Sequence, residues 1–236
     1  MIKEALQYLV ELGNVRVINV NSSSYSTERL HRIDEEQRAD AIEMHTLNSL
    51  VEYIHSKTDS IKDKLLVHVV SPIEVELISS LDSDRKRERL ITVRANIPKI
   101  RFDSFLDQEE FIIMLQSCFE NDCDREIVLQ VAGSVVDNQV AEYGDDGISQ
   151  KATIRQGIAS SCDVKVPNPV VLVPIRTFQE VDQVEQKFVF RMKSERGLQC
   201  ALFEADGGCW RNEAVLRIKN YLVEHLEGVD RITVIA

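Results

Sequence analysis

The sequence predicts an α+β fold, with antiparallel β-sheets on which about four or five helices pack. Three observations support this class. Several segments repeat apolar residues at helical spacing, other segments are short apolar runs typical of strands, and the two kinds do not alternate regularly. Irregular alternation favours α+β over a doubly wound parallel sheet. The 236 residues suit a single domain over 1–236, with 121–124 as the candidate point of subdivision.

The first half of the chain is predicted to contain three helices and four strands. Apolar spacing indicates an amphipathic helix from Ile2 to near Gly13, and a polar, serine-rich turn or loop is expected over 21–27. Thr46 can cap a second helix, and Asp107 can cap a third, with Glu110 at the capping-box position. The predicted strands at 65–70, 75–78 and 90–93 are expected to form an antiparallel meander. The predicted strands cover 15–20, 65–70, 75–78 and 90–93.

The second half of the chain combines two helices with further strands. A helix is expected over about 122–131, ending at Gly133, and strand patterns resume from Val135. The segment 144–147 has the composition of a turn between two strands. Later strands are expected at 170–175, 188–192, 198–203 and 232–235, and a helix is expected at 212–226.

The chain is strongly acidic, with a formal net charge of -11 and a pI near 5.0. The overall field of such a protein does not attract nucleic acid, although a local basic patch still would. A composition of 44% hydrophobic and 28% charged residues is that of an ordinary globular protein, which argues against dominant disorder.

The cysteines and the first residues indicate a reducing, cytoplasmic setting. The five cysteines are odd in number, no two have CxxC spacing, and no histidine stands beside one at zinc-ligand spacing. The opening Met-Ile-Lys-Glu-Ala-Leu lacks the apolar run of a signal peptide or a transmembrane helix. We therefore expect a cytoplasmic protein with reduced thiols, no membrane association and no cofactor.

Two acidic turns are a candidate metal site. Asp145 and Asp146 stand between glycines, while Glu204 and Asp206 precede a glycine pair. Carboxylates from both turns could hold a divalent cation together if the fold makes them converge. We favour the simpler interpretation of two turns without metal, because Gly-Asp-Asp-Gly is typical of hairpin connections.

The densest basic run is a candidate nucleic-acid contact, formed by Arg85, Lys86, Arg87 and Arg89. Four cations close together could clamp the phosphates of a nucleotide or a nucleic acid. Acidic residues interrupt the run, however, and no aromatic residue within it could stack on a base. A solvated hairpin tip is therefore the favoured interpretation.

Three arginines and the single tryptophan are candidate ligand-binding residues. Arg94, Arg176 and Arg191 lie in or beside predicted strands, and they would form a phosphate pocket if they gathered on one face. Trp210 follows a Gly-Gly turn and precedes the C-terminal helix. We favour a hydrophobic staple for Trp210, with a stacking platform or an interface anchor as alternatives.

Common catalytic motifs are missing from the sequence, which contains no GxSxG, HExxH, Walker loop or GxGxxG. The five histidines are scattered, and none has a serine or cysteine nucleophile at motif spacing. We therefore assign no catalytic residue and favour a protein that is not an enzyme.

Three groups of segments carry a family resemblance. The first comprises 89–98, 105–111 and 116–119, the second comprises 145–150, 167–170 and 176–178, and the third comprises 202–208. Together they resemble a family of uncharacterised phage and prophage proteins, a domain of unknown function, over most of the chain. The resemblance implies a bacteriophage origin and expression inside an infected bacterium, and it supplies no activity or catalytic residues.

These observations lead to one main hypothesis and several alternatives. The main hypothesis is a phage-encoded, non-enzymatic binding protein, acting in counter-defence on a host factor, a phage protein or a nucleotide-like small molecule. The alternatives are an accessory protein of phage DNA replication or recombination, a metal-dependent enzyme that uses the four carboxylates, and a self-assembling structural protein. A homo-oligomer is expected, because strand-rich phage proteins often have sheet edges that pair with copies of themselves.

Overall fold

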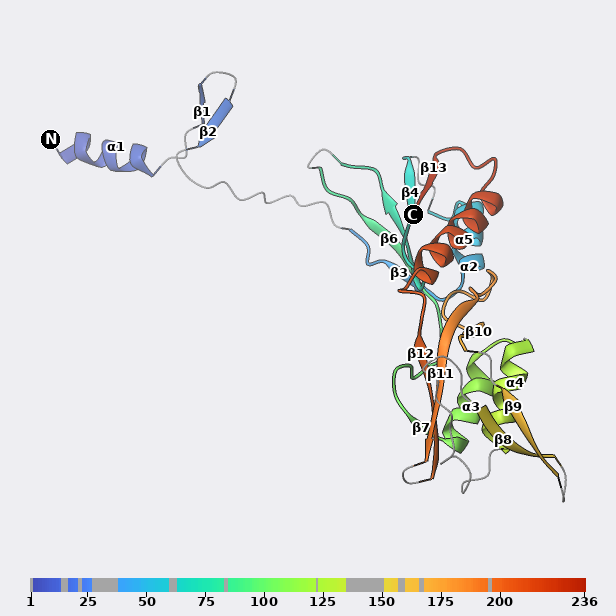
Figure 1. Cartoon of the computed structure of the whole chain (residues 1–236). Coiled ribbons are helices and arrows are strands. Elements are labelled where there is room, and N and C mark those ends of the chain that lie inside the picture. Colours follow the sequence, from blue (N-terminus) through green and yellow to red (C-terminus); the bar gives the residue numbers. More distant parts are fainter. Residues whose placement is uncertain are drawn as a thin grey trace. The chain divides into compact units, whose positions relative to one another are not determined.

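The structure is a computed structural model, and it describes residues 2–13, 17–20, 23–26, 38–59, 63–82, 85–121, 123–134, 151–156, 160–165, 168–194 and 197–236. The chain divides into two compact units, Met1–Ala39 and Asp40–Ala236. The described residues form five helices and 13 strands (Figure 1). The predicted α+β class is confirmed, because the two larger sheets are rich in antiparallel pairs and helices pack on them.

The first unit contains one helix and one hairpin. Helix α1 (Ile2–Leu12) lies where apolar spacing predicts it. Strands β1 (Val17–Val20) and β2 (Ser23–Ser26) pair antiparallel. The prediction of a turn or loop over the whole of 21–27 was therefore wrong. A ladder is made by backbone N–H and C=O groups, so serines can pair with an apolar strand despite their own low strand propensity.

The largest sheet of the second unit has five strands in the order β13-β4-β5-β6-β3. Strands β4 (Leu65–Ser71), β5 (Glu74–Ser79) and β6 (Arg89–Arg94) form the predicted antiparallel meander. Strands β3 (Ile42–Met44) and β13 (Ile232–Ile235) flank it, and they run parallel to β6 and β4 respectively. The strand at 232–235 is confirmed, whereas β3 and both parallel pairings were not predicted.

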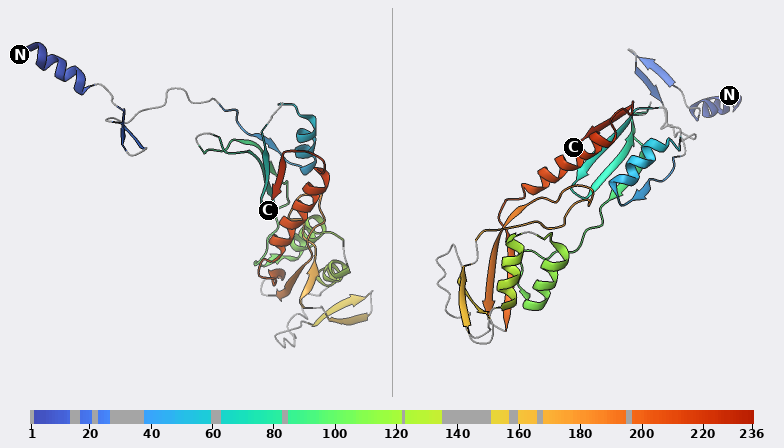
Figure 2. Two further views of the ribbon diagram at one scale, coloured as in Figure 1. Left: turned by 90° about the horizontal axis from the view of Figure 1, so that it is seen from above. Right: turned by 90° about the vertical axis from the view of Figure 1, so that its right-hand side faces the viewer.

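Helices α2 (Leu47–Ser56) and α5 (Trp210–His225) lie on the same face of this sheet (Figure 2). Thr46 caps α2 as predicted, since its Oγ1 accepts the N–H of Ser49 at 3.2 Å. Because strand side chains alternate, every second residue of the meander faces the helices. We call the result the five-stranded core. Its buried members are Leu47, Leu50, Ile54, Leu65, Val67, Val69, Val75, Leu77, Ile91, Val93, Phe178, Val181, Ile218, Leu222 and Leu226.

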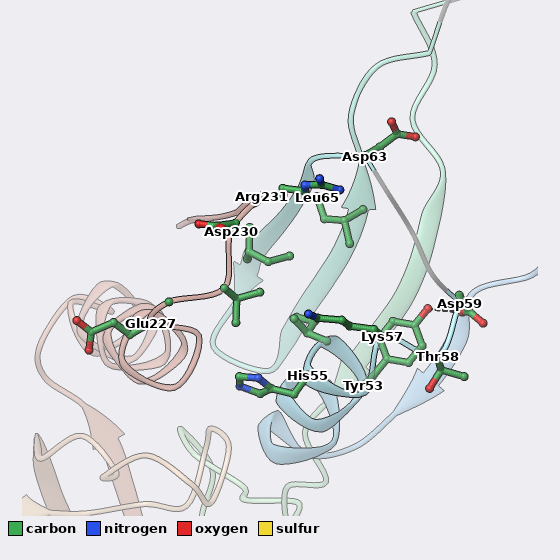
Figure 3. A pocket seen from close by; sticks show the side chains of 14 residues that line it. Tyr53, His55, Lys57, Thr58, Asp59, Asp63, Leu65, Glu227, Asp230 and Arg231 are labelled. Carbon is green, nitrogen blue, oxygen red and sulfur yellow. Dashed lines mark hydrogen bonds between the residues drawn. The ribbon is translucent and has the colours of Figure 1, made fainter.

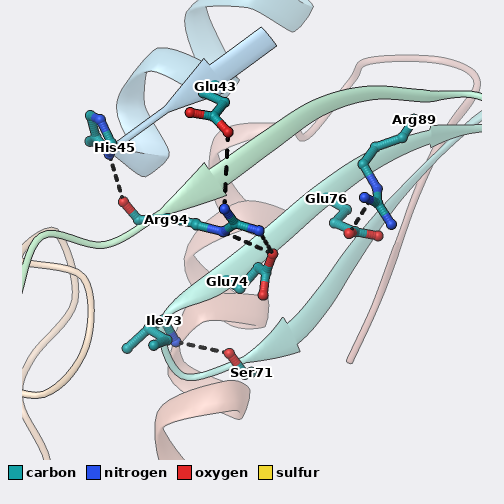
Figure 4. A network of polar contacts seen from close by, with 8 residues as sticks. All are labelled: Glu43, His45, Ser71, Ile73, Glu74, Glu76, Arg89 and Arg94. Carbon is teal, nitrogen blue, oxygen red and sulfur yellow. Dashed lines mark hydrogen bonds and ion pairs between the residues drawn. The ribbon is translucent and has the colours of Figure 1, made fainter. Parts of the chain in front are cut away.

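The opposite face of the sheet carries charged side chains in pairs (Figure 4). Arg94 lies 3.1 Å from Glu74 and 4.0 Å from Glu43, and Arg89 lies 2.9 Å from Glu76. Both arginines are more than half exposed, so each pair contributes at most about 1 kcal/mol. This face of the sheet is therefore exposed to solvent, as is usual for an antiparallel sheet that is covered on one side.

The second sheet has four antiparallel strands in the order β10-β11-β12-β7. The predicted pair at 188–192 and 198–203 is confirmed as β11 (Gln186–Ser194) and β12 (Leu198–Glu204). Strand β10 (Val170–Leu172) is shorter than the predicted 170–175, because the next residues pair with the end of a helix instead. Strand β7 (Leu106–Asp107) completes the sheet.

Helices α3 (Gln108–Cys118) and α4 (Cys123–Ser134) pack beside this second sheet. Asp107 caps α3 as predicted, with its Oδ1 accepting the N–H of Glu110 at 2.8 Å. A further hairpin pairs β8 (Lys151–Gln156) with β9 (Ser160–Lys165). The buried residues between helices and sheet form what we call the four-stranded core. They are Leu106, Phe111, Met114, Leu115, Cys118, Phe119, Val128, Val131, Ala132, Val170, Leu172, Phe188, Phe190, Met192, Leu198, Cys200 and Leu202.

The segment between β10 and β11 connects the two cores. Phe178 and Val181 from this segment belong to the five-stranded core, although the strands before and after it belong to the other one. Thr177 donates through Oγ1 to the carbonyl of Pro72 in the meander. The buried Gln183 side chain accepts the N–H of Arg176 at 2.9 Å and so fixes the start of the crossing. Arg176 is thereby placed at the junction of the two cores.

Candidate functional site

Arg176 is enclosed by aromatic rings at the junction of the two cores. Its Cζ lies 3.9 Å from the ring centre of Trp210, 5.0 Å from that of Phe102 and 5.9 Å from that of Phe188. Its Nη1 donates to Glu204 in an ion pair, and the residue is only 8% exposed. Cation–π contacts and a charge-assisted hydrogen bond together hold the guanidinium in one position.

Several polar atoms in this cluster have no hydrogen-bond partner among the described residues, namely Nε and Nη2 of Arg176 and Nε1 of Trp210. Burial lowers the pKa of Arg176 from its usual value, while Glu204 and Asp206 act in the opposite direction. The guanidinium stays charged, because an arginine titrates far above neutral pH. These donors suit an anion chemically, but they are buried, and a ligand would reach them only if Arg176 moved. The arrangement therefore favours a structural role for Arg176, in which it holds the two cores together.

Trp210 is the first residue of α5, and its ring is a stacking platform for the chain's own Arg176. The interpretation of Trp210 as a hydrophobic staple was therefore wrong. A staple pairs a residue before the cap with one in the next helical turn, whereas Trp210 lies inside the helix and faces a cation. Arg211 approaches the same ring at 5.0 Å.

The two carboxylates of segment 202–208, Glu204 and Asp206, have structural roles. Asp206 accepts the N–H of Gly208 at 2.8 Å and that of Trp210 at 3.2 Å, so it satisfies N–H groups where α5 begins. It also accepts from the buried Gln186 side chain at 2.7 Å. Gly208 has φ +84°, which only glycine adopts at low cost, and this bend turns the chain from β12 into α5.

The metal hypothesis stays a prediction. Glu204 pairs with Arg176 and Asp206 caps a helix, while Asp145 and Asp146 lie outside the described residues. Over the part of the chain that the structure describes, no three His, Cys, Asp or Glu side chains are grouped to hold a metal ion. The carboxylates that can be located are thus committed to an arginine and to backbone N–H groups.

The three candidate arginines have different partners. Arg94 pairs with Glu74 and Glu43 on the five-stranded sheet, and Arg176 pairs with Glu204. Arg191 lies in β11 and donates through Nη1 to the carbonyl of Phe190 at 3.1 Å. Of the predicted ligand-binding residues, the structure brings Arg176 and Trp210 together and gives Arg94 and Arg191 other contacts.

Three residues of the basic run, Arg85, Lys86 and Arg87, lie in the connection from β5 to β6, as the hairpin interpretation predicts, and Arg89 is the first residue of β6. Arg85 has φ +61° and donates its N–H to the carbonyl of Asp82, and the Asp82 side chain accepts the N–H of Lys86 at 2.7 Å. Arg87 donates to the carbonyl of Ser79, and Arg89 pairs with Glu76. Two of the four cations therefore have partners within the sheet.

A cleft between α2, β4 and the connection from α5 to β13 is a feature that the sequence did not predict (Figure 3). We call it the α2–β13 cleft, and its volume is about 730 Å³. Tyr53, Lys57 and Asp59 lie on one side of it, and Glu227 and Asp230 lie on the other. Its described lining residues are Tyr53, Ile54, His55, Lys57, Thr58, Asp59, Asp63, Leu65, Glu227, Gly228, Val229, Asp230, Arg231 and Ile232.

Two chain reversals open this cleft. Helix α2 ends with Lys57 in the left-handed conformation, at φ 51°. After α5, the chain reverses at Gly228, whose φ of +79° suits glycine, and enters β13 beside β4. The carbonyl of Arg231 accepts the N–H of Leu65 at 2.9 Å and anchors this entry. The cleft is the space left between the two helix ends.

The cleft has an apolar floor and a charged rim. Ile54 and Leu65 belong to the buried core, and the half-buried Val229 and Ile232 pack against it. The described rim carries four carboxylates against two cations, which gives a formal charge of -2 with His55 neutral. The lining residues come from segments more than 160 positions apart, so no local sequence pattern could have revealed them.

Polar side chains in the cleft are held in place by specific partners. The Tyr53 hydroxyl donates to the Asp59 carboxylate. Burial, reinforced by this hydrogen bond and by the charge of Asp59, raises the pKa of Tyr53 to about 12. His55 Nε2 lies 3.0 Å from the carbonyl of His225 and links the two helix ends. The hydroxyl of Tyr53 is therefore a neutral group at physiological pH.

Neither a protein-family model, nor a curated protein, nor a solved structure matches this chain. Among the described residues, no helix is both long and apolar enough to cross a membrane.

Proposed function

We propose that the protein is a non-enzymatic binding protein of phage origin, acting in the infected bacterium, and that its α2–β13 cleft takes a small organic ligand. The observation that carries the proposal is a cleft of about 730 Å³ with an apolar floor and a charged rim. Ligand pockets typically measure about 300–1,000 Å³ and combine apolar walls with a few polar groups. The phage setting is supported by the sequence resemblance.

The charge of the rim favours a ligand with an amine or another cationic group. Four carboxylates surround an apolar floor, and only Lys57 and Arg231 oppose them among the described lining residues. A nucleotide would bring negative charge to a site that is already negative, which costs binding free energy. We therefore propose a ligand with an apolar or aromatic body and a protonated amine, in place of a nucleotide-like molecule.

The polar groups of the cleft are suited to recognition. The Tyr53 hydroxyl is neutral and bound to Asp59, so that this pair offers an oriented acceptor for a cation. Asp230 and Glu227 offer further carboxylates from the opposite side (Figure 3). An amine that spans the cleft would meet acceptors on both sides while its body covers the apolar floor.

The proposal is tested by titrating the full-length protein with phenethylamine, spermidine and ATP, followed by NMR chemical shifts and calorimetry. We expect saturable binding of an amine, with shifts at residues that line the cleft. Asp230→Lys should weaken this binding about tenfold or more, because it replaces an attraction by a repulsion. Glu109→Lys makes the same charge change at an exposed position on α3 and should leave binding unchanged.

Two results would count against the proposal. If no probe shifts residues of the cleft, the cleft is not a ligand site for these classes. If ATP binds there more tightly than both amines, the rim charge does not decide the ligand class and the amine assignment is wrong.

A further inference from the structure

The two cationic residues that line the α2–β13 cleft, Lys57 and Arg231, both have a backbone conformation that favours glycine. Lys57 has φ 51° at the end of α2, and Arg231 has φ 79° directly before β13. A residue with a Cβ is strained in this left-handed region, which glycine adopts freely. In the described part of the chain, four residues other than glycine have such a φ, and two of them line this one cleft. Backbone strain of this kind is common at sites where a side chain faces a ligand.

The Lys57 side chain extends from the end of α2 toward the middle of the cleft (Figure 3). Over the described residues, its ammonium makes no ion pair and no hydrogen bond. Asp59 stands only two positions away, but it accepts the hydroxyl of Tyr53 instead. The α2 side of the cleft therefore offers an ammonium and an oriented carboxylate that do not pair with each other.

The floor next to these two charges is apolar. Ile54 and Leu65 belong to the five-stranded core, and Val229 and Ile232 pack against it. A ligand that covers this floor removes apolar surface from water, which favours binding in proportion to the area covered. A ligand that suits the whole α2 side thus needs an amine for Asp59, an acidic group for Lys57 and an apolar body for the floor.

We propose that the cleft takes an α-amino acid with an aromatic or apolar side chain, whose carboxylate pairs with Lys57 and whose amine pairs with Asp59. This ligand class rests on the proposed binding function, since it specifies the occupant of the same cleft. An α-amino acid carries both charges on one carbon, and hydrogen bonds between charged groups are the strong kind. It has no net charge, so it does not add to the negative charge of the rim as a nucleotide would.

The opposite side of the cleft also carries an acid next to a cation, namely Asp230 and Arg231 (Figure 3). Arg231, however, already takes part in another interaction. Lys57 has none among the described residues, so a carboxylate gains an ion pair there without breaking an existing one. The charged end of the ligand is therefore assigned to the α2 side.

Three ligands with the same phenyl body separate the two charges. Phenylalanine carries both, phenethylamine carries the amine alone, and phenylpropanoate carries the carboxylate alone. Calorimetric titration of the full-length protein should show that phenylalanine binds about fivefold more tightly than phenethylamine, because it gains the ion pair with Lys57. Phenylpropanoate should bind most weakly, since it meets the negative rim without an amine.

These titrations distinguish the ligand class from the proposed function. If phenethylamine shifts the NMR signals of cleft residues and phenylalanine binds no more tightly, the amino-acid assignment is wrong while the cleft remains an amine site. If neither amine shifts those signals, the proposed binding function is itself wrong.

The variant Lys57→Gly tests the partner of the carboxylate. It removes the ammonium and the backbone strain together, so phenylalanine should bind about fivefold more weakly while the unfolding temperature does not fall. Phenethylamine should bind as tightly as before or more tightly, because a repelling charge is lost. Lys57→Arg keeps the charge and should bind phenylalanine within about twofold of the wild type. Asp59→Asn should weaken both ligands, since both carry the amine.

The matched control is Arg85→Gly. Arg85 carries the same charge and has φ +61°, but it lies in the connection from β5 to β6 and does not line the cleft. This variant relieves the same kind of strain and should leave both affinities unchanged. Equal weakening of phenylalanine and phenethylamine in Lys57→Gly, or a loss of phenylalanine binding in Arg85→Gly as large as in Lys57→Gly, would overturn the assignment.

Discussion

At the scale of the residue, Arg176 shows how a buried charge can be held without a full set of hydrogen bonds. Its guanidinium has one carboxylate partner, Glu204, and rests on the faces of Trp210 and Phe102. Two of its nitrogens lack a partner among the described residues, which costs free energy. The aromatic faces offset part of this cost through cation–π attraction. Arg176 therefore contributes most when the whole cluster is intact.

Replacing Arg176 with alanine should lower the free energy of unfolding by roughly 3 kcal/mol, because breaking a buried pair leaves the other charge uncompensated. Urea unfolding followed by the fluorescence of Trp210, the single tryptophan, would measure this loss at the site itself. The control is Arg191→Ala, since Arg191 is half-buried and its Nη1 bonds to the carbonyl of the preceding residue. That variant should lose less than about 1 kcal/mol. Equal losses of unfolding free energy in the two variants would show that Arg176 stabilises the fold no more than Arg191 does.

At the scale of the element, the start of α5 depends on a carboxylate that precedes the helix by four residues. Asp206 accepts two backbone N–H groups there, and Gly208 provides the backbone bend. Sequence reasoning treated this acidic turn as a metal candidate, because turn carboxylates that cap helices and turn carboxylates that bind cations have the same composition. Only their neighbours in space distinguish the two roles.

Asp206→Ala should cost about 1–2 kcal/mol of stability, the usual range for losing a helix-capping side chain. Asp206→Asn keeps an acceptor oxygen and should lose less. Thermal unfolding by circular dichroism measures both, and hydrogen exchange at the Trp210 amide reports the cap directly. Asp182→Ala, at an exposed residue in the connection between β10 and β11, serves as a control and should be neutral. An Asp206→Ala protein as stable as the wild type would contradict the capping role.

Elements with a clear local signal could be predicted from the sequence. The caps at Thr46 and Asp107, the meander from β4 to β6 and the hairpin of β11 with β12 are all set by neighbouring residues. Strand β3 has three residues and no long apolar run, and its pairing with β6 is parallel and distant. Parallel partners carry no turn signal, because the chain between them is long. The α2–β13 cleft was not predicted either, because its lining residues come from segments more than 160 positions apart.

At the scale of the whole molecule, the described members of both cores lie in residues 47–226, within the second unit. The first unit has 39 residues, which is near the lower limit for a domain that folds alone. The two cores are nested in sequence, since the segments of the four-stranded core interrupt those of the five-stranded core. The second unit is therefore expected to behave as one body when the first is removed.

A protein that begins at Asp40 should keep its unfolding temperature within a few degrees, because no described core residue is lost. Circular dichroism melting of this shortened chain and of the full chain would compare them. A chain that is unfolded, or that melts far below the full-length protein, would show that residues 1–39 stabilise the rest. Mass spectrometry would verify that both samples are intact.

The nested order has a consequence for the protein as it leaves the ribosome. All strands of the four-stranded sheet have been synthesised once the chain reaches residue 204. Strand β4, in contrast, has no partner on one edge until β13, residues 232–235, has been made. During that interval one edge of β4 is open, and α5 has yet to cover the sheet. An open strand edge is a template for wrong partners. The synthesis of residues 205–235 is thus the period in which the nascent chain most needs protection from wrong strand partners.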